Sequence, residues 1–238
     1  MGKSILCPYC FETFDNTEVM VQCDNFATRT IDGKPKEICE REENRLFNEH
    51  WDENVMSKHV FSPNISFLDR IRGYKPKPCK CDQCGANSSR FVCPHCNNWL
   101  PTEMIEKGSE IISVIGGPAS GKSNYIVALI NQLQKYGYKL QLGQILPQLV
   151  GRNKAEYTRN LYEKAKDSIF KYHTPVAKTA TTVHPIPWIF RLESHATKKA
   201  VYLVFYDTAG ESYKEPEERR RNAKYLDKTR AVIDLMNT

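Results

Sequence analysis

Two features of this sequence combine residue types and spacings that can do chemistry: a glycine-rich run in the middle and cysteine pairs near the start. The run has the form GxxxxGK[ST] and consists of Gly116, Gly117, Pro118, Ala119, Ser120, Gly121, Lys122 and Ser123. In such a loop glycines let backbone N–H groups wrap a phosphate chain, the lysine reaches the β- and γ-phosphates, and the hydroxyl binds Mg²⁺. We therefore expect this run and Asn124 to bind a nucleoside triphosphate, with Lys122 in a catalytic role and Ser123 on Mg²⁺.

A second element of a phosphate site follows in the stretch AVYLVFYDTAGE. The apolar residues 201–206 lead directly into Asp207, and Gly210 follows three residues later. An acid at the carboxyl end of a buried strand can enter the Mg²⁺ shell, and a glycine N–H can meet a γ-phosphate. The pattern predicts that Asp207 acts in catalysis and on Mg²⁺, and that Gly210 contacts the nucleotide.

The nine cysteines all lie at or before position 96. They are Cys7, Cys10, Cys23, Cys39, Cys79, Cys81, Cys84, Cys93 and Cys96. An odd number without a signal peptide argues against a disulfide framework, and two thiolates of a CxxC pair can both reach one tetrahedral ion. The pattern predicts one or two Zn²⁺ ions and a reducing, cytoplasmic location.

The sequence leaves the grouping of these cysteines open. The set we favour joins two CxxC knuckles across eight residues, as in a zinc ribbon: Cys81, Cys84, Cys93 and Cys96. A third knuckle, Cys7 and Cys10 in LCPYCF, resembles VCPHCN closely enough to pair with Cys93 and Cys96 instead. A second ion would need Cys7, Cys10 and two ligands from Cys23, Cys39, Cys79, His50 or His59.

The elements around these motifs predict two domains, residues 1–108 and 109–238, since Pro101 and Gly108 punctuate the chain just before its pattern changes. In the first domain EICEREENRLFNEHWDENV predicts one short helix, and SPNISFLDRIRGYKPKP predicts extended chain. In the second, EIISVI is typical of a buried strand, and apolar residues then recur at helical spacing up to Gly137. We expect Lys122 to be exposed when the loop between them is empty.

The stretch between Ser123 and Asp207 is long and predicts a helical insert at about residues 151–173. Its apolar residues share one helix face and its basic residues lie elsewhere, so the helix either packs on the domain or contacts a partner or nucleic acid. Residues 188–192 predict a second strand. The net charge of +6 permits phosphate-rich partners without requiring them, and no apolar run is long enough to predict a membrane partner.

The motifs GGPASGKS and FYDTAGE together resemble those of the Ras-like, translation-factor-class (TRAFAC) P-loop GTPases. The cysteine-rich start, with CPYCFETF and CPHCNNWLP, resembles more narrowly the bacterial double-GTPase family found with conflict and defence systems. The resemblance implies an α/β P-loop NTPase fold with a mostly parallel, Ras-like sheet, preceded by a small cysteine-rich zinc-binding domain. It also implies that GTP and Mg²⁺ are bound and that the protein is a regulatory GTP switch.

The same resemblance assigns roles to further residues. A threonine of the first switch should contact Mg²⁺, and Thr181 and Thr182 rank ahead of Thr179. The family's water-positioning residue falls on Glu211, a carboxylate that would repel the γ-phosphate, so hydrolysis should be slow. The run Arg219–Arg221 is either a solvated face or the source of an arginine finger for a neighbour.

The last residues predict a strand, 231–236, that lies beside the strand preceding the glycine-rich loop. A Ras-like domain would continue with a base-reading [NT]KxD motif, which this sequence does not contain. The resemblance therefore implies the front half of a G domain, an incomplete sheet that a protein partner or self-association completes. The alternatives are an ATP-binding P-loop protein, and a zinc-dependent protein- or nucleic-acid-binding module whose P-loop does not hydrolyse nucleotide.

Overall fold

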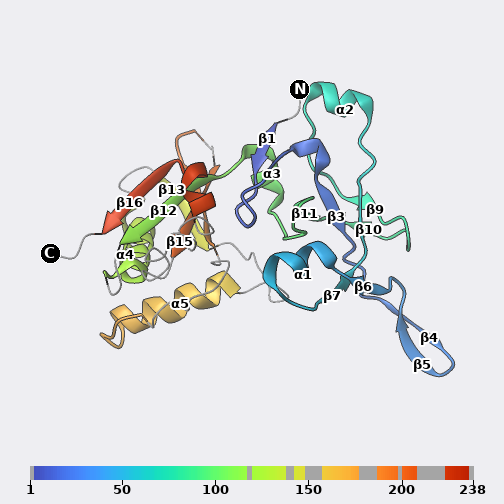
Figure 1. The fold of residues 1–238 in the computed structure, drawn as a ribbon, viewed down its shortest axis with the longest axis horizontal. Helices are drawn as coiled ribbons and strands as arrows, with labels where there is room; N and C mark the ends of the chain where they lie inside the picture. The colour runs from blue at the N-terminus through green and yellow to red at the C-terminus, as the bar shows by residue number, and fades with distance from the viewer. Residues whose placement is uncertain are drawn as a thin grey trace. The chain divides into compact units, whose positions relative to one another are not determined.

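The computed structural model describes residues 3–116, 120–137, 142–147, 157–176, 187–197, 200–207 and 223–235. The chain divides into two compact units, Met1–Gly108 and Ser109–Thr238 (Figure 1). The first unit contains all nine cysteines, and the second contains the glycine-rich motif. The division falls at the glycine where the sequence pattern changes.

The first unit is assembled from strands of two to four residues joined in small antiparallel ladders. The strands are β1 (Ser4–Leu6), β2 (Thr13–Asp15), β3 (Met20–Gln22), β4 (Thr28–Ile31), β5 (Lys34–Glu37), β6 (Arg41–Glu43), β7 (Met56–Lys58), β8 (Val60–Phe61), β9 (Cys79–Lys80), β10 (Asn87–Ser88) and β11 (Arg90–Val92). The helices are η1 (Asn16–Glu18), α1 (Arg45–Trp51), α2 (Phe67–Arg72) and α3 (Thr102–Lys107). Such short strands form sheets of modest size, so the unit depends on what joins them.

The two local predictions for the middle of this unit had opposite outcomes. The predicted short helix is α1, whose first turn is capped by Asn44: its side chain accepts a hydrogen bond from the Phe47 N–H. The predicted extended chain over SPNISFLDRIRGYKPKP is wrong, because residues 67–72 form α2. Ser66 caps that helix by accepting from the Asp69 N–H, and Gly73, at φ 92°, ends it. Six residues are too few to show a helical period in the sequence, so the capping residue Ser66 was the signal from which this helix could have been predicted.

The second unit is an α/β domain around a five-stranded sheet in the order β13-β14-β15-β12-β16. Its strands are β12 (Glu110–Gly116), β13 (Leu142–Pro147), β14 (Trp188–Ser194), β15 (Ala200–Asp207) and β16 (Ala231–Leu235). The helices within its described residues are α4 (Lys122–Tyr136), α5 (Tyr157–Phe170) and η3 (Ala223–Lys228). The predicted strands and the helix after the glycine-rich motif are confirmed, and β16 lies beside β12 as expected, with Gly116 opposite Leu235.

The sheet is mixed: four strands share one direction, and β14 runs against them. β12 is parallel to β15 and β16, whereas β14 is antiparallel to both β15 and β13. The sequence analysis did not predict β13 at all. Because β14 runs against its two neighbours, both of its pairings are antiparallel, and a short connection leads from β14 to β15.

The core of the second unit lies between one face of the sheet and the two helices α4 and α5 (Figure 1). It joins Val114 of β12 and Phe205 of β15 to Ile126 of α4 and Tyr162 of α5. Tyr162 is fully buried, and its hydroxyl donates a 2.7 Å hydrogen bond to the Gln134 side chain. Helix α5 is the described part of the predicted insert, and the interpretation that it packs on the domain is confirmed.

Candidate metal centres and nucleotide site

The three CxxC knuckles adopt the same backbone conformation at the tips of three turns. In each, the N–H of the fourth residue after the first cysteine donates to that cysteine's carbonyl, at 3.1 Å for Phe11, 2.8 Å for Gly85 and 2.9 Å for Asn97. These three residues have φ values of 61°, 70° and 49°. Left-handed backbone at this position turns the chain back so that both sulfurs of the pair face one point.

Backbone N–H groups also point at the sulfurs, as the tight turns predict. The Tyr9 N–H donates to Cys7 Sγ and the His95 N–H donates to Cys93 Sγ, each at 3.4 Å. Hydrogen bonds of this kind stabilise thiolates, which are the ligand form of cysteine. The knuckles therefore have the local structure of metal-binding turns.

Eight of the nine cysteines form two groups whose four sulfurs all lie within 4.8 Å of one another. The double-knuckle cluster contains Cys7, Cys10, Cys93 and Cys96; the mixed cluster contains Cys23, Cys39, Cys81 and Cys84. The sulfur–sulfur distances are 3.7 Å for Cys7–Cys96, 3.8 Å for Cys10–Cys93 and 3.6 Å for Cys23–Cys84. Four thiolates around tetrahedral Zn²⁺, with Zn–S bonds of about 2.3 Å, would be about 3.8 Å apart.

This grouping corrects the four-cysteine set that the sequence favoured, Cys81, Cys84, Cys93 and Cys96. The reason is the antiparallel pairing of β3 with β11, in which Met20 lies opposite Val92 and Gln22 lies opposite Arg90. Cys93 leaves β11 at one end of this ladder, and Cys23 leaves β3 at the other end. The Cys93–Cys96 knuckle therefore begins at one end of the ladder, whereas the Cys81–Cys84 knuckle groups with Cys23 at the other end. Each knuckle completes its set of four ligands with two further cysteines.

A buried lysine, which the sequence did not single out, holds the backbone of the mixed cluster at Cys39. Lys58 of β7 is buried, and its Nζ donates to the Cys39 carbonyl at 2.6 Å and to Glu37 at 2.7 Å. Hydrogen bonds from Arg41 and Lys58 lower the pKa of Glu37 to about 2. The Asn25 side-chain amide lies 3.6 Å from Cys84 Sγ. Nothing in the sequence distinguishes Lys58 from other lysines, because its role depends on burial in the folded unit.

The remaining candidate ligands of the first unit belong to neither group. Cys79 is half-buried, and its sulfur lies 4.0 Å from the Ser88 carbonyl. His59 lies between two carboxylates, with Nδ1 2.7 Å from Glu42 and Nε2 2.8 Å from Asp82. Of the described residues that could ligate a metal, His50, His59 and Cys79 are therefore outside both clusters.

The thiols of these clusters differ in pKa, and a hydrogen bond with Cys7 lowers the pKa of Cys10. Desolvation raises the pKa of the Cys7 thiol well above its ordinary value, and it raises the pKa of Cys39 and Cys81 in the mixed cluster. Four adjacent sulfurs, three of them buried in each cluster, cannot all ionise without a compensating charge. A divalent cation supplies that charge, so the donor set fits a Zn²⁺ ion that displaces the thiol protons.

The nucleotide site is built where β12 meets α4. The strand ends at Gly116, and α4 begins at Lys122 after Gly121, whose φ of 81° is left-handed. Helix α4 starts without a side-chain cap, so its first N–H groups are directed at the loop. Gly116 also packs tightly, since a Cβ there would lie 2.5 Å from the Leu235 carbonyl of β16.

Lys122 is buried, which corrects the expectation that it is exposed in the empty loop. Lys122 is only 7% exposed to solvent. Its Nζ donates a hydrogen bond to the Gly116 carbonyl at 3.0 Å and lies 3.4 Å from Ser120 Oγ. A cation left without phosphate is costly to bury unless oxygens surround it. The loop's own oxygens serve that purpose here, and they hold the ammonium at the point where the strand gives way to the loop.

Strand register brings the second motif to the same edge of the sheet. Asp207, the last residue of β15, lies opposite Val114 of β12, two residues before Gly116. The backbone of Asp207 is thus placed beside the start of the glycine-rich loop. Ser123 follows Lys122 in the first turn of α4 and is half-buried.

Asn124 has a contact that the sequence did not predict. Its side-chain oxygen accepts a 3.0 Å hydrogen bond from the Val176 N–H, which lies beyond α5. The first turn of α4 is therefore tied to the segment that leads toward the predicted first switch. The remaining predicted site residues lie outside the described ranges: Gly117, Pro118, Ala119, Thr179, Thr181, Thr182, Gly210, Glu211 and Arg219–Arg221.

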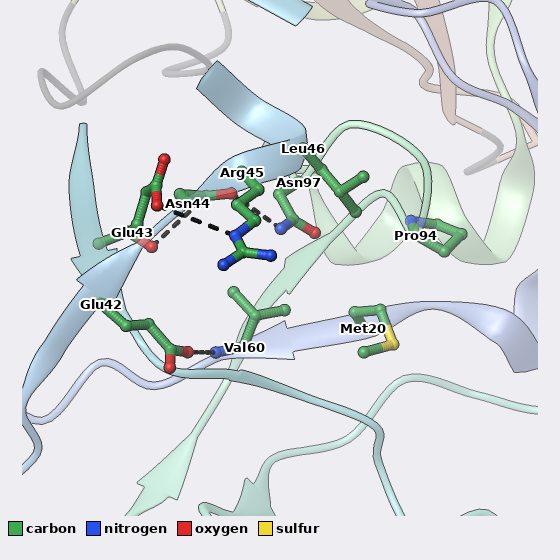
Figure 2. Close-up of a pocket in the computed structure, with 10 residues that line it drawn as sticks. Met20, Glu42, Glu43, Asn44, Arg45, Leu46, Val60, Pro94 and Asn97 are labelled. Carbon is green, nitrogen blue, oxygen red and sulfur yellow. Dashed lines mark hydrogen bonds and ion pairs between the residues drawn. The ribbon is translucent and has the colours of Figure 1, made fainter. Parts of the chain in front are cut away.

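A shallow pocket of about 320 Å³ lies in the first unit beside the double-knuckle cluster. Figure 2 shows the apolar side chains of Met20 and Val60 across the pocket from Leu46, with Pro94 and Asn97 contributed by the Cys93 knuckle. Asn97 donates a 2.9 Å hydrogen bond to the Asn44 side chain, which also caps α1. The pocket therefore lies between the Cys93 knuckle and the start of α1.

The second unit is thus a mixed α/β domain whose β12–α4 connection carries a phosphate-binding sequence, and the first is a cysteine-rich unit with two metal-ligand clusters. Residues 113–232 match the family model of Double-GTPase 1. Because this match spans half of the 238 residues, the chain belongs to the Double-GTPase 1 family. No curated protein and no solved structure matches it. Among the described residues no helix is long and apolar enough to cross a membrane.

Proposed function

We propose that the protein is a GTP-dependent regulatory switch that binds Mg²⁺ with its nucleotide and hydrolyses it slowly. The observation that carries this is the family match, because it covers the second half of β12, α4 and β15 and indicates a GTP-binding function. The placement of Lys122, Ser123 and Asp207 around one end of β12 supports it. A role in bacterial conflict or defence follows from the family resemblance and belongs to the same proposal.

In this proposal the phosphate chain takes the place of the oxygens that now surround Lys122. The ammonium would leave the Gly116 carbonyl for the β- and γ-phosphates, and the positive end of the α4 dipole would face the same anion. Ser123 and Asp207 would hold Mg²⁺, which neutralises charge on the phosphates. Glu211 in the water-positioning place would make turnover slow, since its carboxylate repels the γ-phosphate.

We also propose that each cysteine cluster binds one Zn²⁺ ion and that these ions are structural. All four ligands of each cluster come from the protein, which leaves no position open for a reacting water. Within the described residues β16 pairs with β12 alone, so its outer edge can accept a strand from another segment or a partner protein.

Titration of the protein with fluorescent (mant) GTP and ATP, with and without Mg²⁺, tests the nucleotide proposal. We expect Mg²⁺-dependent binding of GTP, and we expect Lys122→Ala to weaken it at least about tenfold, because charge-assisted hydrogen bonds to phosphate are lost. The matched control Lys228→Ala, an exposed lysine of the same unit, should bind like the wild type. Tighter binding of ATP than of GTP would favour the alternative ATP-binding protein, and no binding of either would favour the zinc-dependent module.

A further inference from the structure

Helix α2 of the first unit presents an apolar surface to solvent. Phe67 is 74% exposed, and Leu68 and Ile71 are each 57% exposed. No residue of this helix is buried. Isolated exposed apolar residues are ordinary, but three large ones side by side on one short helix mark a contact surface.

Positively charged side chains border this apolar surface on both sides. At about 100° per residue, the three apolar side chains span an arc of about 100°, with Arg70 on one side of the arc and Arg72 on the other. Asp69 lies on the opposite face, where it pairs with Lys77 at 3.2 Å. Exposed Lys75 continues the cationic border beyond the helix.

The helix is held in place before it meets any partner. Ser66 caps its start, and the Asp69–Lys77 pair braces it against the chain that follows. Tyr74, just beyond the helix, is buried, and its carbonyl accepts a 3.0 Å hydrogen bond from the Asn16 side chain. In Figure 1, α2 projects from the first unit at the end of two connecting segments. The apolar residues therefore sit on an anchored projection, which costs little further ordering when it binds.

We propose that α2 docks onto an anionic lipid surface, with Phe67, Leu68 and Ile71 entering the headgroup boundary and Arg70, Arg72 and Lys75 contacting lipid phosphates. A narrow apolar arc bordered by cations on both sides is the arrangement of helices that lie in a membrane interface. Cations near such a surface add attraction for anionic headgroups. The projecting form favours a lipid surface over a peptide, which would need a groove to lie in.

This proposal departs from the expectation of no membrane partner, which rested on the lack of a spanning segment. Contact with a membrane surface needs no spanning helix, because a few apolar side chains and a cationic border are enough for reversible binding. It would bring the GTP-binding family member to a membrane through a unit that does not bind the nucleotide. The proposal stands independently of the nucleotide function.

Co-sedimentation of the full chain with vesicles tests it. We expect binding to vesicles of phosphatidylcholine mixed with phosphatidylglycerol, weak binding to phosphatidylcholine alone, and weaker binding at high salt because charges are screened. Phe67→Ser/Leu68→Ser should lower the affinity about tenfold or more through lost apolar burial. Arg70→Glu/Arg72→Glu should abolish the preference for the anionic lipid. All four side chains are exposed, so circular dichroism should show both variants folded.

A charge-matched control is available on the exposed β4–β5 hairpin. Lys34→Glu/Lys36→Glu changes the net charge by the same amount as the Arg70/Arg72 variant and should retain binding to anionic vesicles. An equal loss in this control would show unspecific electrostatics and overturn the proposal, as would no binding by the wild type. If the Phe67/Leu68 variant instead changes the oligomeric state without any vesicle binding, the face is covered by protein and the lipid proposal is wrong.

Discussion

The cysteine clusters show how single side chains decide which metal site forms. Each cluster takes its sulfurs from at least two separate turns, and the four sulfurs of each lie within 4.8 Å of one another, close enough for one tetrahedral ion. Cys79, by contrast, lies within two residues of Cys81 in the sequence and takes no part. Position in the fold, and not closeness in the sequence, therefore assigns the ligands.

Substitution of one ligand should remove one ion. We expect Cys93→Ser to lower the zinc content from two ions per chain to about one, because the double-knuckle cluster loses a thiolate that three others cannot replace. Cys79→Ser is the matched control and should keep both ions. Metal analysis by mass spectrometry measures the difference. Equal zinc in the two variants would show that Cys93 is not a ligand.

Gly116 lies where its surroundings leave no space for a larger side chain. Its φ is 150°, and a Cβ would lie 2.5 Å from the Leu235 carbonyl and 2.7 Å from Ser120 Oγ. We expect Gly116→Ala to lower the free energy of unfolding of the second unit by about 1–3 kcal/mol, since backbone and β16 must both shift. Urea unfolding measures it. Gly121→Ala in the same unit, with a positive φ of 81° but open space around it, should cost less; a larger loss there would contradict the packing argument.

At the level of elements, the contact between Asn124 and Val176 joins α4 to the chain beyond α5. The acceptor of this hydrogen bond, Asn124, lies in the first turn of α4, next to the residues proposed to bind phosphate and Mg²⁺. A shift of this turn on nucleotide binding would therefore be felt at residue 176. The hydrogen bond is the described link between the nucleotide site and the segment before the predicted first switch.

Removing this link should free the segment without unfolding the helix. We expect Asn124→Ala to increase amide hydrogen exchange at Val176 about fivefold, because a hydrogen bond contributes about 1 kcal/mol. Its neighbour Tyr125, an exposed residue of the same helix, provides the control Tyr125→Ala, which should leave that exchange rate unchanged. Hydrogen exchange monitored by mass spectrometry or NMR checks both, and equal rates in the wild type and Asn124→Ala would exclude the tether.

The elements that sequence reasoning predicted correctly are those with strong local signals. β12 and β15 are continuous apolar runs ahead of recognisable motifs, and α4 has a clear helical period. β13 was missed because its stretch, LGQILP, lies between motifs and contains a glycine and a proline that suggest a loop. The grouping of the cysteines was left open for a different reason: three knuckles with the same local structure are distinguished by the pairing of β3 with β11, a contact between distant parts of the chain.

At the scale of the whole molecule, the two units differ in what stabilises them. The second has a sheet of five strands covered by α4 and α5, with a buried aromatic and aliphatic core. The first has strands of two to four residues in separate ladders, and its two sulfur clusters bring together turns that are far apart in the sequence. Strands this short gain little stability alone, so the ions would stabilise the first unit much more than the second.

Removal of zinc should therefore separate the behaviour of the two units. We expect a thiol-compatible zinc chelator to abolish the cooperative thermal transition of the first unit, because four closely spaced thiols per cluster would remain without the cation that brings them together. The second unit should retain its transition, and binding of mant-GTP should remain within about twofold of its initial affinity. Calorimetry and nucleotide titration on the same sample measure the two responses, and added Zn²⁺ should restore the first transition. Loss of nucleotide binding together with zinc would show that the second unit depends on the metal centres, and an unchanged first transition would show that the clusters are not what holds that unit together.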